Sequence, residues 1–485
     1  MLWQHARRWG ALDPFHLATL ALLVVVAVWM VLPLAWLLAQ ASRGYSEGWN
    51  ALVALRALSD LPLYPQDQTL HTNNYPPLSF YLVGGLGALI GDHMVAGRLI
   101  SLAAVAAVAL EIALAVRLLG GTWWVSAFAG LLFVAGAMGL DHRPVGGNEP
   151  HMLAHAVMLA GLVVLLKGQG SGRHVAGAAV LMVGGGLIKH NLLGLPLAVT
   201  FWLLLNDPRA LRVWLLAAGA SVAAALAALW LAYGPAVFDN ILGARSYSLS
   251  RMRRITRQGL QNLQILLAGS LFLVALQPRA PGPQLAGLYV GCALLVASLL
   301  VGGAGTGVNL FFEPLIASCI AAGLLVQQAG RWVGADLVRP GSVRAALAAV
   351  LIFGVGIHLP GDSIRILLGA SPVRKAEAET RADLAFLAGI EGRVMCETLA
   401  LCYWTGKGLE VDSFNARQGF LARGHDEQVL LDLLASGGLA AVQLTSADPD
   451  RDDERISAAF MDSLLRHYRL ARVSDNGLFF VYDAR

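Results

Sequence analysis

Long apolar stretches alternate with short polar ones through most of the chain. A helix that crosses a membrane needs roughly 20 mostly apolar residues. Residues 76–91 are apolar but short and glycine-rich, and they begin with two prolines, so they predict a juxtamembrane or re-entrant helix. On the same measure the pattern predicts about 11 transmembrane helices, near residues 16–40, 95–119, 122–140, 149–167, 173–189, 190–206, 211–233, 260–277, 283–301, 311–328 and 343–360.

The pattern changes near residue 369. Beyond it charged residues are frequent and no apolar run reaches spanning length. Short apolar runs predict strands, and the stretches between them have helical periodicity. We therefore expect a membrane domain over residues 1–368 and a small α/β domain over residues 369–485. The expected strands are 394–395, 439–444 and 478–482, and the expected helices are 376–387, 427–434 and 453–467.

The composition agrees with a membrane protein. Of the 485 residues, 57% are hydrophobic and only 14% are charged, which is more apolar surface than one soluble core could bury. The fold class expected is therefore an all-α polytopic membrane protein with a small C-terminal α/β domain. The net charge is +4 with no block of Lys and Arg, so we expect no nucleic-acid partner. Cys396 and Cys402 could form a disulfide outside the cytoplasm or stay a buried thiol pair.

Basic residues gather in alternate loops, as the positive-inside rule requires. Counting 76–91 as a full span would place these charges outside, so the charge pattern supports the re-entrant interpretation. The polar segments 41–94, 141–148, 234–258 and 302–310, together with the C-terminal domain, are then expected on the outer face. With the N-terminus inside, the cytoplasmic loops contain Arg117, Lys167, Arg173, Arg209, Arg212, Arg279, Arg331, Arg339 and Arg344.

Acidic residues at the outer helix mouths are the first candidates for chemistry. Glu47 lies in the outer loop 41–94, and Asp141 and Glu149 lie in and just after the next outer loop. Ionisable groups at such depths are costly and mark functional sites. The alternative for Glu47 and Glu149 is a structural acid in the first turn of a helix. Glu313, about one turn into a later span, should have a cationic partner or line a polar cavity.

One outer loop breaks the charge rule. Residues 245–257, RSYSLSRMRRITR, contain five arginines and no acid. Guanidinium groups near the bilayer surface suit phosphate because their planar fork gives bidentate contacts. The alternative for this loop is that one span is misplaced and the loop is cytoplasmic. Lys189, at the outer end of a predicted helical hairpin, is also a candidate, and its alternative is a lysine that snorkels to the membrane interface. The residues expected to bind substrate or a lipid phosphate are Arg98, Lys189, His190, Arg245, Arg251, Arg253, Arg254, Arg257, Tyr75, Asn309 and Glu313.

His151 and His155 are candidate metal ligands. Their i, i+4 spacing places both on one face of a helix, which is the geometry of paired zinc ligands. No HExxH motif accompanies them, and most such pairs are hydrogen-bonded core residues. A divalent metal is therefore a weak candidate cofactor.

Together these residues indicate a reaction with two substrates, one of them a lipid phosphate. Glycosyl transfer from a polyprenyl-phosphate sugar to an acceptor hydroxyl needs these parts. A carboxylate removes the acceptor proton, and arginines stabilise the leaving phosphate. Inversion at the sugar carbon follows by analogy with glycosidases.

The sequence resembles the GT-C superfamily of integral-membrane glycosyltransferases. The nearest branch contains protein O-mannosyltransferases, the aminoarabinose transferase of lipid A and RgtA/B/C/D-like proteins. The resemblance covers most of residues 40–330 in order. It rests on the segments GYSEGWNALVALRAL, NNYPPLSFYLVG, AGRLIS, GGNEPHMLAHAVMLAG, GLIKHNLLGLP and GVNLFFEPLIA.

The resemblance implies a set of functional expectations. The donor would be a polyprenyl-phosphate sugar, the acceptor a lipid, glycan or protein, and the location the periplasmic side of a bacterial inner membrane. Members usually have an Asp-Glu pair in the first outer loop, whereas this chain has Ser46-Glu47. By position Glu47 would be the catalytic carboxylate, with Asp141 or Glu149 as the acid of the second loop. Many relatives carry an extracytoplasmic domain that could correspond to the C-terminal segment.

Two other classes of function remain open at this stage. A secondary transporter also has polar residues near helix mouths, but it predicts inverted repeats and charges near the bilayer midplane. A protein that binds or flips a lipid phosphate without catalysis would need the basic residues but no general base.

Overall fold

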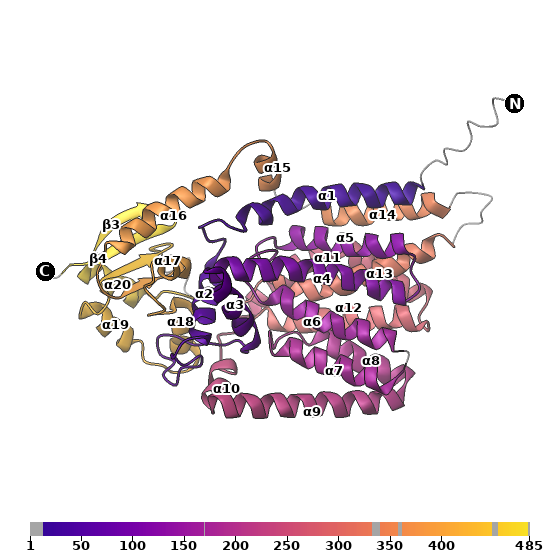
Figure 1. Ribbon diagram of the computed structural model, residues 1–485, viewed down its shortest axis with the longest axis horizontal. Coiled ribbons are helices and arrows are strands. Elements are labelled where there is room, and N and C mark those ends of the chain that lie inside the picture. The colour runs from indigo at the N-terminus through magenta and orange to yellow at the C-terminus, as the bar shows by residue number, and fades with distance from the viewer. Residues whose placement is uncertain (1–12, 169, 332–339, 357–360, 449–453, 484–485) are drawn as a thin grey trace.

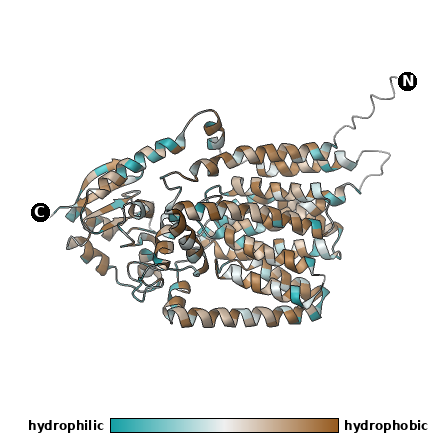
Figure 2. Cartoon of the chain, viewed as in Figure 1, coloured by the Kyte–Doolittle hydropathy of each residue, from teal (hydrophilic) through white to brown (hydrophobic). Residues whose placement is uncertain are grey.

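The computed structural model describes residues 13–168, 170–331, 340–356, 361–448 and 454–483. A bundle of apolar helices forms the N-terminal part, and a mixed α/β unit lies at one end of it, beyond α2 and α3 (Figure 1). Apolar residues dominate the bundle, whereas hydrophilic residues concentrate in the end unit and on α16 (Figure 2).

The expected spans correspond to helices of the bundle. Among the residues that the structure describes, seven helices are long and apolar enough to cross a membrane, or eight if α14 and α15 form one bent span. The helices α3, α6, α7 and α8 are shorter than this, so the predicted number of spans stays a prediction. The helices are α1 (Pro14–Trp36), α3 (Leu78–Ile90), α4 (His93–Leu118), α5 (Trp123–Leu140), α6 (His151–Lys167), α7 (Gly172–Gly186), α8 (Gly194–Asn206), α9 (Pro208–Tyr233), α11 (Leu249–Leu276), α12 (Pro281–Leu300), α13 (Phe312–Ala329), α14 (Pro340–Gly356) and α15 (Gly361–Leu367).

Two polar stretches of the outer segments are helical. Segment 41–94 contains α2 (Tyr45–Ala57) and α3, and α3 rises only about 20 Å, which is shorter than a bilayer core. The arginines expected in a loop at 245–257 mostly lie on the first turns of α11, which begins at Leu249 rather than near residue 260. The Ser248 hydroxyl accepts from the Arg251 backbone N–H and caps this helix, and arginine is a good helix former, so the helix extends beyond its apolar part.

The C-terminal unit, residues Pro372–Tyr482, is built on a four-stranded sheet in the order β1-β2-β4-β3. β1 (Val394–Cys396) is parallel to β2 (Ala441–Leu444), and β4 (Gly477–Tyr482) is antiparallel to both β2 and β3 (Tyr468–Ser474). Strands form at all three expected positions, but β3 was missed because most of its side chains are solvent-exposed or half-exposed. The helices of this unit are α16 (Pro372–Ala388), α17 (Leu399–Trp404), α18 (Ser413–Ala422), α19 (Gln428–Ala435) and α20 (Ala458–His467).

The C-terminal unit packs directly on α2. The α17 backbone approaches Gly48 so closely that a Cβ there would lie 2.0 Å from the Ala400 nitrogen. Asp412, which is fully buried, accepts hydrogen bonds from the Tyr45 hydroxyl and from Trp49 Nε1 (2.7 Å) on α2. A disulfide between Cys396 and Cys402 closes the turn that leads into α17. α2 is therefore held between the bundle and the C-terminal unit.

Candidate active site

A cavity of about 380 Å³ lies where α2, the bundle and the C-terminal unit meet, and we call it the polar cavity. Seven short stretches, spread from residue 43 to residue 455, contribute to it. Its lining includes Arg43, Ser46, Glu47, Trp49, Tyr75, Asp141, Arg143, Glu149, Arg245, Arg251, Asn309, Phe414, Asn415, Glu454 and Arg455. The structure thus brings together the three acids predicted to be catalytic, Glu47, Asp141 and Glu149.

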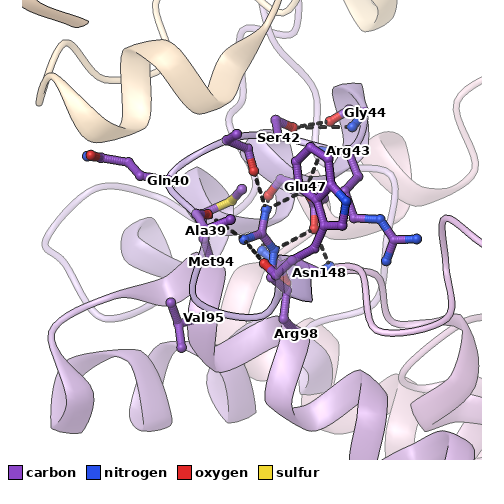
Figure 3. A network of polar contacts seen from close by, with 12 residues as sticks. Ala39, Gln40, Ser42, Arg43, Gly44, Glu47, Met94, Val95, Arg98 and Asn148 are labelled. Carbon is purple, nitrogen blue, oxygen red and sulfur yellow. Dashed lines mark hydrogen bonds and ion pairs between the residues drawn. The ribbon is translucent and has the colours of Figure 1, made fainter. Parts of the chain in front are cut away.

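Glu47 forms a buried ion pair with Arg98 (Figure 3). Arg98 Nε donates to Glu47 Oε1 and Arg98 Nη2 donates to Oε2, both at 2.9 Å. The same carboxylate accepts from the backbone N–H groups of Arg43 (2.7 Å) and Asn148 (3.0 Å). Its four acceptor positions are therefore occupied. Burial alone would raise the pKa of Glu47, but the Arg98 hydrogen bonds and charge, with the two backbone donors, lower it overall.

Arg98 is fully buried and its remaining donors are also satisfied. Its two Nη atoms donate to the backbone carbonyls of Trp36 (2.8 Å), Ala39 (2.7 Å) and Ala41 (2.6 Å) (Figure 3). The sequence suggested that Arg98 binds a phosphate, yet no donor of the guanidinium is left for one. These contacts join α4 to α2 and to the end of α1, so phosphate binding by Arg98 stays an untested prediction that its contacts do not support.

Glu149 has a different environment. Its Oε1 accepts from the Ser46 hydroxyl at 2.5 Å, and its side chain lines the polar cavity. Burial raises the pKa of Glu149, against the opposing effects of the Lys189 charge and the Ser46 hydrogen bond. Ser46 directly precedes Glu47 in the first turn of α2. The structure therefore places a carboxylate from the α5–α6 loop beside this turn.

Asp141 is the third acid of the cavity. It accepts from Arg143 Nε at 3.1 Å, and the Arg143 side chain is 63% exposed. An ion pair this accessible is weak and leaves the carboxylate free to exchange partners. The Asp141 side chain itself is only 11% exposed and lines the polar cavity.

Lys189 contacts Tyr75, a lining residue of the polar cavity. Lys189 is 5% exposed, and its Nζ lies 3.4 Å from the Tyr75 hydroxyl and 4.8 Å from the centre of the Tyr75 ring. Tyr75 lines the polar cavity, whereas Pro76 and His190 line a second cavity of about 580 Å³. This apolar cavity lies between α7, α8 and α9 and is lined mainly by aliphatic side chains.

The five arginines of residues 245–257 separate into groups. Arg245 and Arg251 line the polar cavity. Arg245 Nη2 donates to Asn415 Oδ1 at 3.1 Å, and its guanidinium lies 5.2 Å from the centre of the Phe414 ring. Arg251 forms an ion pair with Glu454 of the C-terminal unit. Arg253 and Arg257 line a separate groove on α11, so the structure does not bring them to the same site.

Glu313 corrects one sequence prediction. Instead of a cationic side chain, the buried carboxylate accepts from the backbone N–H groups of Leu195 (2.7 Å) and Gly194 (3.3 Å). These amides form the N-terminus of α8, where the helix dipole favours a negative charge. Glu313 is not part of the polar cavity lining and joins α13 to α8 instead.

The histidine pair lies in the bundle wall beside Asn309. The His151 and His155 rings stack at 5.3 Å and are almost fully buried, and His151 Nδ1 lies 3.4 Å from Asn309 Nδ2. Within the described residues no group of three or more His, Cys, Asp or Glu side chains is arranged to hold a metal ion. The residues present therefore do not form a metal site by themselves.

The C-terminal residues of the cavity were missed in the sequence. Phe414, Asn415 and Arg455 line the polar cavity, lie more than 350 positions after Tyr45 and belong to no motif. Arg455 is stacked over the Tyr45 ring at 4.5 Å. Asn148 could have been noticed, because it is adjacent to Glu149 and its backbone binds Glu47.

Comparisons with known proteins address the fold. A family model for the 6-pyruvoyl-tetrahydropterin synthase related domain, described as a membrane protein, matches residues 72–277. No curated protein matches the chain by sequence.

Solved structures match over almost the whole chain. ArnT from Cupriavidus metallidurans bound to undecaprenyl phosphate has a TM-score of 0.62 at 12% identity, over 98% of this chain and 99% of that one. The same protein in the apo state gives 0.60 at 13% identity, over 95% and 97%. The oligosaccharyltransferase AglB from Archaeoglobus fulgidus, in complex with an inhibitory peptide and a dolichol-phosphate, gives 0.51 at 11% identity, over 97% and 74%. The chain therefore has the fold of the GT-C integral-membrane glycosyltransferases that its sequence resembles.

Proposed function

We propose that the protein is a glycosyltransferase that moves a sugar from a polyprenyl-phosphate donor to an acceptor hydroxyl, with inversion at the sugar carbon. The observation that carries this proposal is Glu149, a carboxylate with a raised pKa in the wall of a polar cavity that also contains arginines. A base whose pKa is raised towards the working pH is suited to proton abstraction. The similarity to ArnT bound to undecaprenyl phosphate and to AglB with dolichol-phosphate supports a lipid-phosphate donor.

The apolar cavity is the proposed seat of the polyprenyl chain. It lies between helices of the bundle, and Pro76 at its edge follows Tyr75 of the polar cavity, so a lipid there would direct its phosphate towards Tyr75 and Lys189. Lys189 and Arg245 carry the positive charge that a phosphate needs, and guanidinium and ammonium groups bind it well.

The chemical step follows from this placement. Glu149 takes the proton of the acceptor hydroxyl as the oxygen attacks the anomeric carbon from the side opposite the phosphate. The bond between that carbon and the phosphate oxygen breaks, and the electron pair leaves with polyprenyl phosphate. Lys189 and Arg245 stabilise the leaving phosphate, so no general acid is needed. The sequence predicted that Glu47 is the base. Because Arg98 and two backbone amides occupy all four acceptor positions of its carboxylate, we propose a positioning role for Glu47 instead. No step uses a metal.

The reaction can be tested with the purified full-length protein. Synthetic undecaprenyl-phosphate sugars should be consumed and undecaprenyl phosphate released in the presence of a membrane extract that contains acceptors. Lys189→Gln should slow release by about tenfold or more, since it removes a charge-assisted contact to the leaving phosphate. Binding of undecaprenyl phosphate without any turnover, across a panel of sugars, would instead favour a lipid-phosphate binding protein.

We further propose that the polar cavity and the C-terminal unit face the periplasm of a bacterial inner membrane. The Cys396–Cys402 disulfide supports this side, because disulfides persist in oxidising compartments. The basic loop at Lys167 and Arg173 would then face the cytoplasm.

Cysteine labelling would check this orientation. In a Cys292→Ala background, Ser436→Cys in the C-terminal unit should react with a membrane-impermeant maleimide in intact spheroplasts. Ser171→Cys, an equally exposed serine before α7, should react only after lysis. Reaction of Ser171→Cys alone in intact cells would reverse the proposed orientation.

A further inference from the structure

A third cavity, of about 630 Å³, adjoins the polar cavity, and we call it the basic cavity. Arg251 and Glu454 line both cavities, so their ion pair forms the partition between them. The rest of its lining comes from the segment before α11, the first turns of α11, the residues after α12 and one leucine of α18. It consists of Ser246, Tyr247, Ser248, Ser250, Arg254, Gly302, Ala304 and Leu421.

Helix geometry explains why this cavity is basic. Arg251 and Arg254 are three residues apart on α11 and share a face that lines the basic cavity, whereas Arg253 and Arg257 share another face and line a different groove. Arg254 is exposed, and within the described residues it takes part in no hydrogen bond or ion pair. Its guanidinium is thus available to a ligand.

The charge balance of the cavity favours an anion. Two arginines face one acid, and that acid is already engaged by Arg251. The Ser248 and Ser250 hydroxyls lie 2.8 Å apart at the N-terminus of the 28-residue helix α11, where the dipole adds positive potential. An anion with several oxygens could therefore contact two guanidinium groups and two hydroxyls together.

The Arg251–Glu454 pair is accessible enough to exchange. The two side chains are 20% and 25% exposed, so the pair is partly screened by water and is weaker than the buried Glu47–Arg98 pair. A phosphate carries more charge than one carboxylate and accepts bidentate contacts from arginine. It can therefore replace Glu454 on Arg251 and join the two cavities.

We propose that the basic cavity binds a phosphate group carried by the acceptor, and that Glu454 occupies Arg251 until this phosphate arrives. That this phosphate belongs to an acceptor rests on the proposed glycosyltransferase function, whereas the anion site itself does not. The donor lipid enters the polar cavity from the apolar cavity, and the acceptor enters from the opposite wall, with its hydroxyl directed at Glu149. The acceptor class is therefore a phosphorylated molecule rather than a neutral sugar or peptide.

The test uses inorganic pyrophosphate as the probe and calorimetry as the measurement. The full-length protein, in neutral detergent, is first saturated with undecaprenyl phosphate so that the donor phosphate position is filled. Arg254→Gln should weaken pyrophosphate binding by about tenfold or more, as expected for loss of a charge-assisted contact. Glu454→Gln should tighten it by about two- to fivefold, because it removes a competing surface carboxylate.

Arg253→Gln is the matched control, since it removes the same charge one position away on the other face of α11. Equal losses in Arg253→Gln and Arg254→Gln would mean non-specific attraction and would overturn the proposal, as would weaker binding in Glu454→Gln. Displacement of pyrophosphate by phosphatidylglycerol in nanodiscs, but not by phosphatidylcholine, would assign the cavity to a membrane lipid and overturn the acceptor role.

Failure of the proposed function can be distinguished from failure of this inference. If no sugar donor is turned over but the Arg254-dependent binding persists, the anion site stands and the glycosyltransferase proposal falls. If Glu149→Gln abolishes transfer but no variant of the basic cavity changes pyrophosphate binding, the glycosyltransferase proposal stands and the anion site falls.

Discussion

Glu149→Gln should reduce sugar transfer by about a hundredfold to ten-thousandfold, the usual contribution of a general base. Glutamine keeps the size of the side chain and can still bind the Ser46 hydroxyl, but it cannot take a proton. Polyprenyl-phosphate affinity and thermal stability should stay near those of the unchanged protein. Single-turnover release of undecaprenyl phosphate measures the effect. Glu391→Gln, an exposed acid of the C-terminal unit, controls for the loss of one charge.

The pH dependence gives an independent check on the same residue. The base acts in its ionised form, so activity should fall as the pH decreases through the pKa of Glu149. Because burial raises that pKa above the ordinary 4.5, the acidic limb of the profile should lie above this value. Lys189→Gln should move the limb to still higher pH, since the lysine charge lowers the pKa of Glu149. If Asp141→Asn abolishes transfer and Glu149→Gln does not, the base is Asp141.

Arg98→Met should destabilise the protein by about 3–5 kcal/mol, the cost of leaving a buried charge without its partner. The change leaves Glu47 without its bidentate donor and three backbone carbonyls without theirs. Thermal unfolding in detergent measures the loss. Arg143→Met is the matched control: its ion pair with Asp141 is largely exposed, and its loss should cost at most about 1 kcal/mol.

Two further results would test the Arg98 argument. Adding Glu47→Gln to Arg98→Met should recover part of the stability, because the unpaired charge is then removed. The lowered pKa of Glu47 means that its stabilising effect is complete above the ordinary value of 4.5 and is lost as the pH falls through the lowered value. Equal stability of Arg98→Met and Arg143→Met would show that the buried pair contributes little.

The sequence predicted the apolar helices well because spanning length and loop charge are local signals. Charged groups at helix mouths are conspicuous among apolar residues, so the sequence also pointed to Glu149, Asp141 and Arg245, which line the polar cavity; their roles stay predictions. It could not tell which carboxylate is free. Glu47 looked like the base by position, and only its contacts with Arg98 and two amides assign it to the framework.

Other predictions were wrong because one sequence pattern can arise from two different structures. The arginines after residue 248 looked like a loop because hydropathy alone sets the apparent start of a span, whereas the capped helix α11 begins earlier. Glu313 appeared to need a cation because helix N-terminal amides, which satisfy it, have no sequence signature. Asp412 and Arg455 reach α2 from a remote part of the chain, and no periodicity links them to it.

The contact of Gly48 with Ala400 bears on how the two parts of the chain can be recombined with those of other proteins. Any methyl group at position 48 would collide with the α17 backbone, so the C-terminal unit fits only an α2 helix that has glycine at that position. Chimaeras that exchange the C-terminal unit with that of a relative should therefore lose the proposed transfer activity unless α2 and α17 are exchanged together.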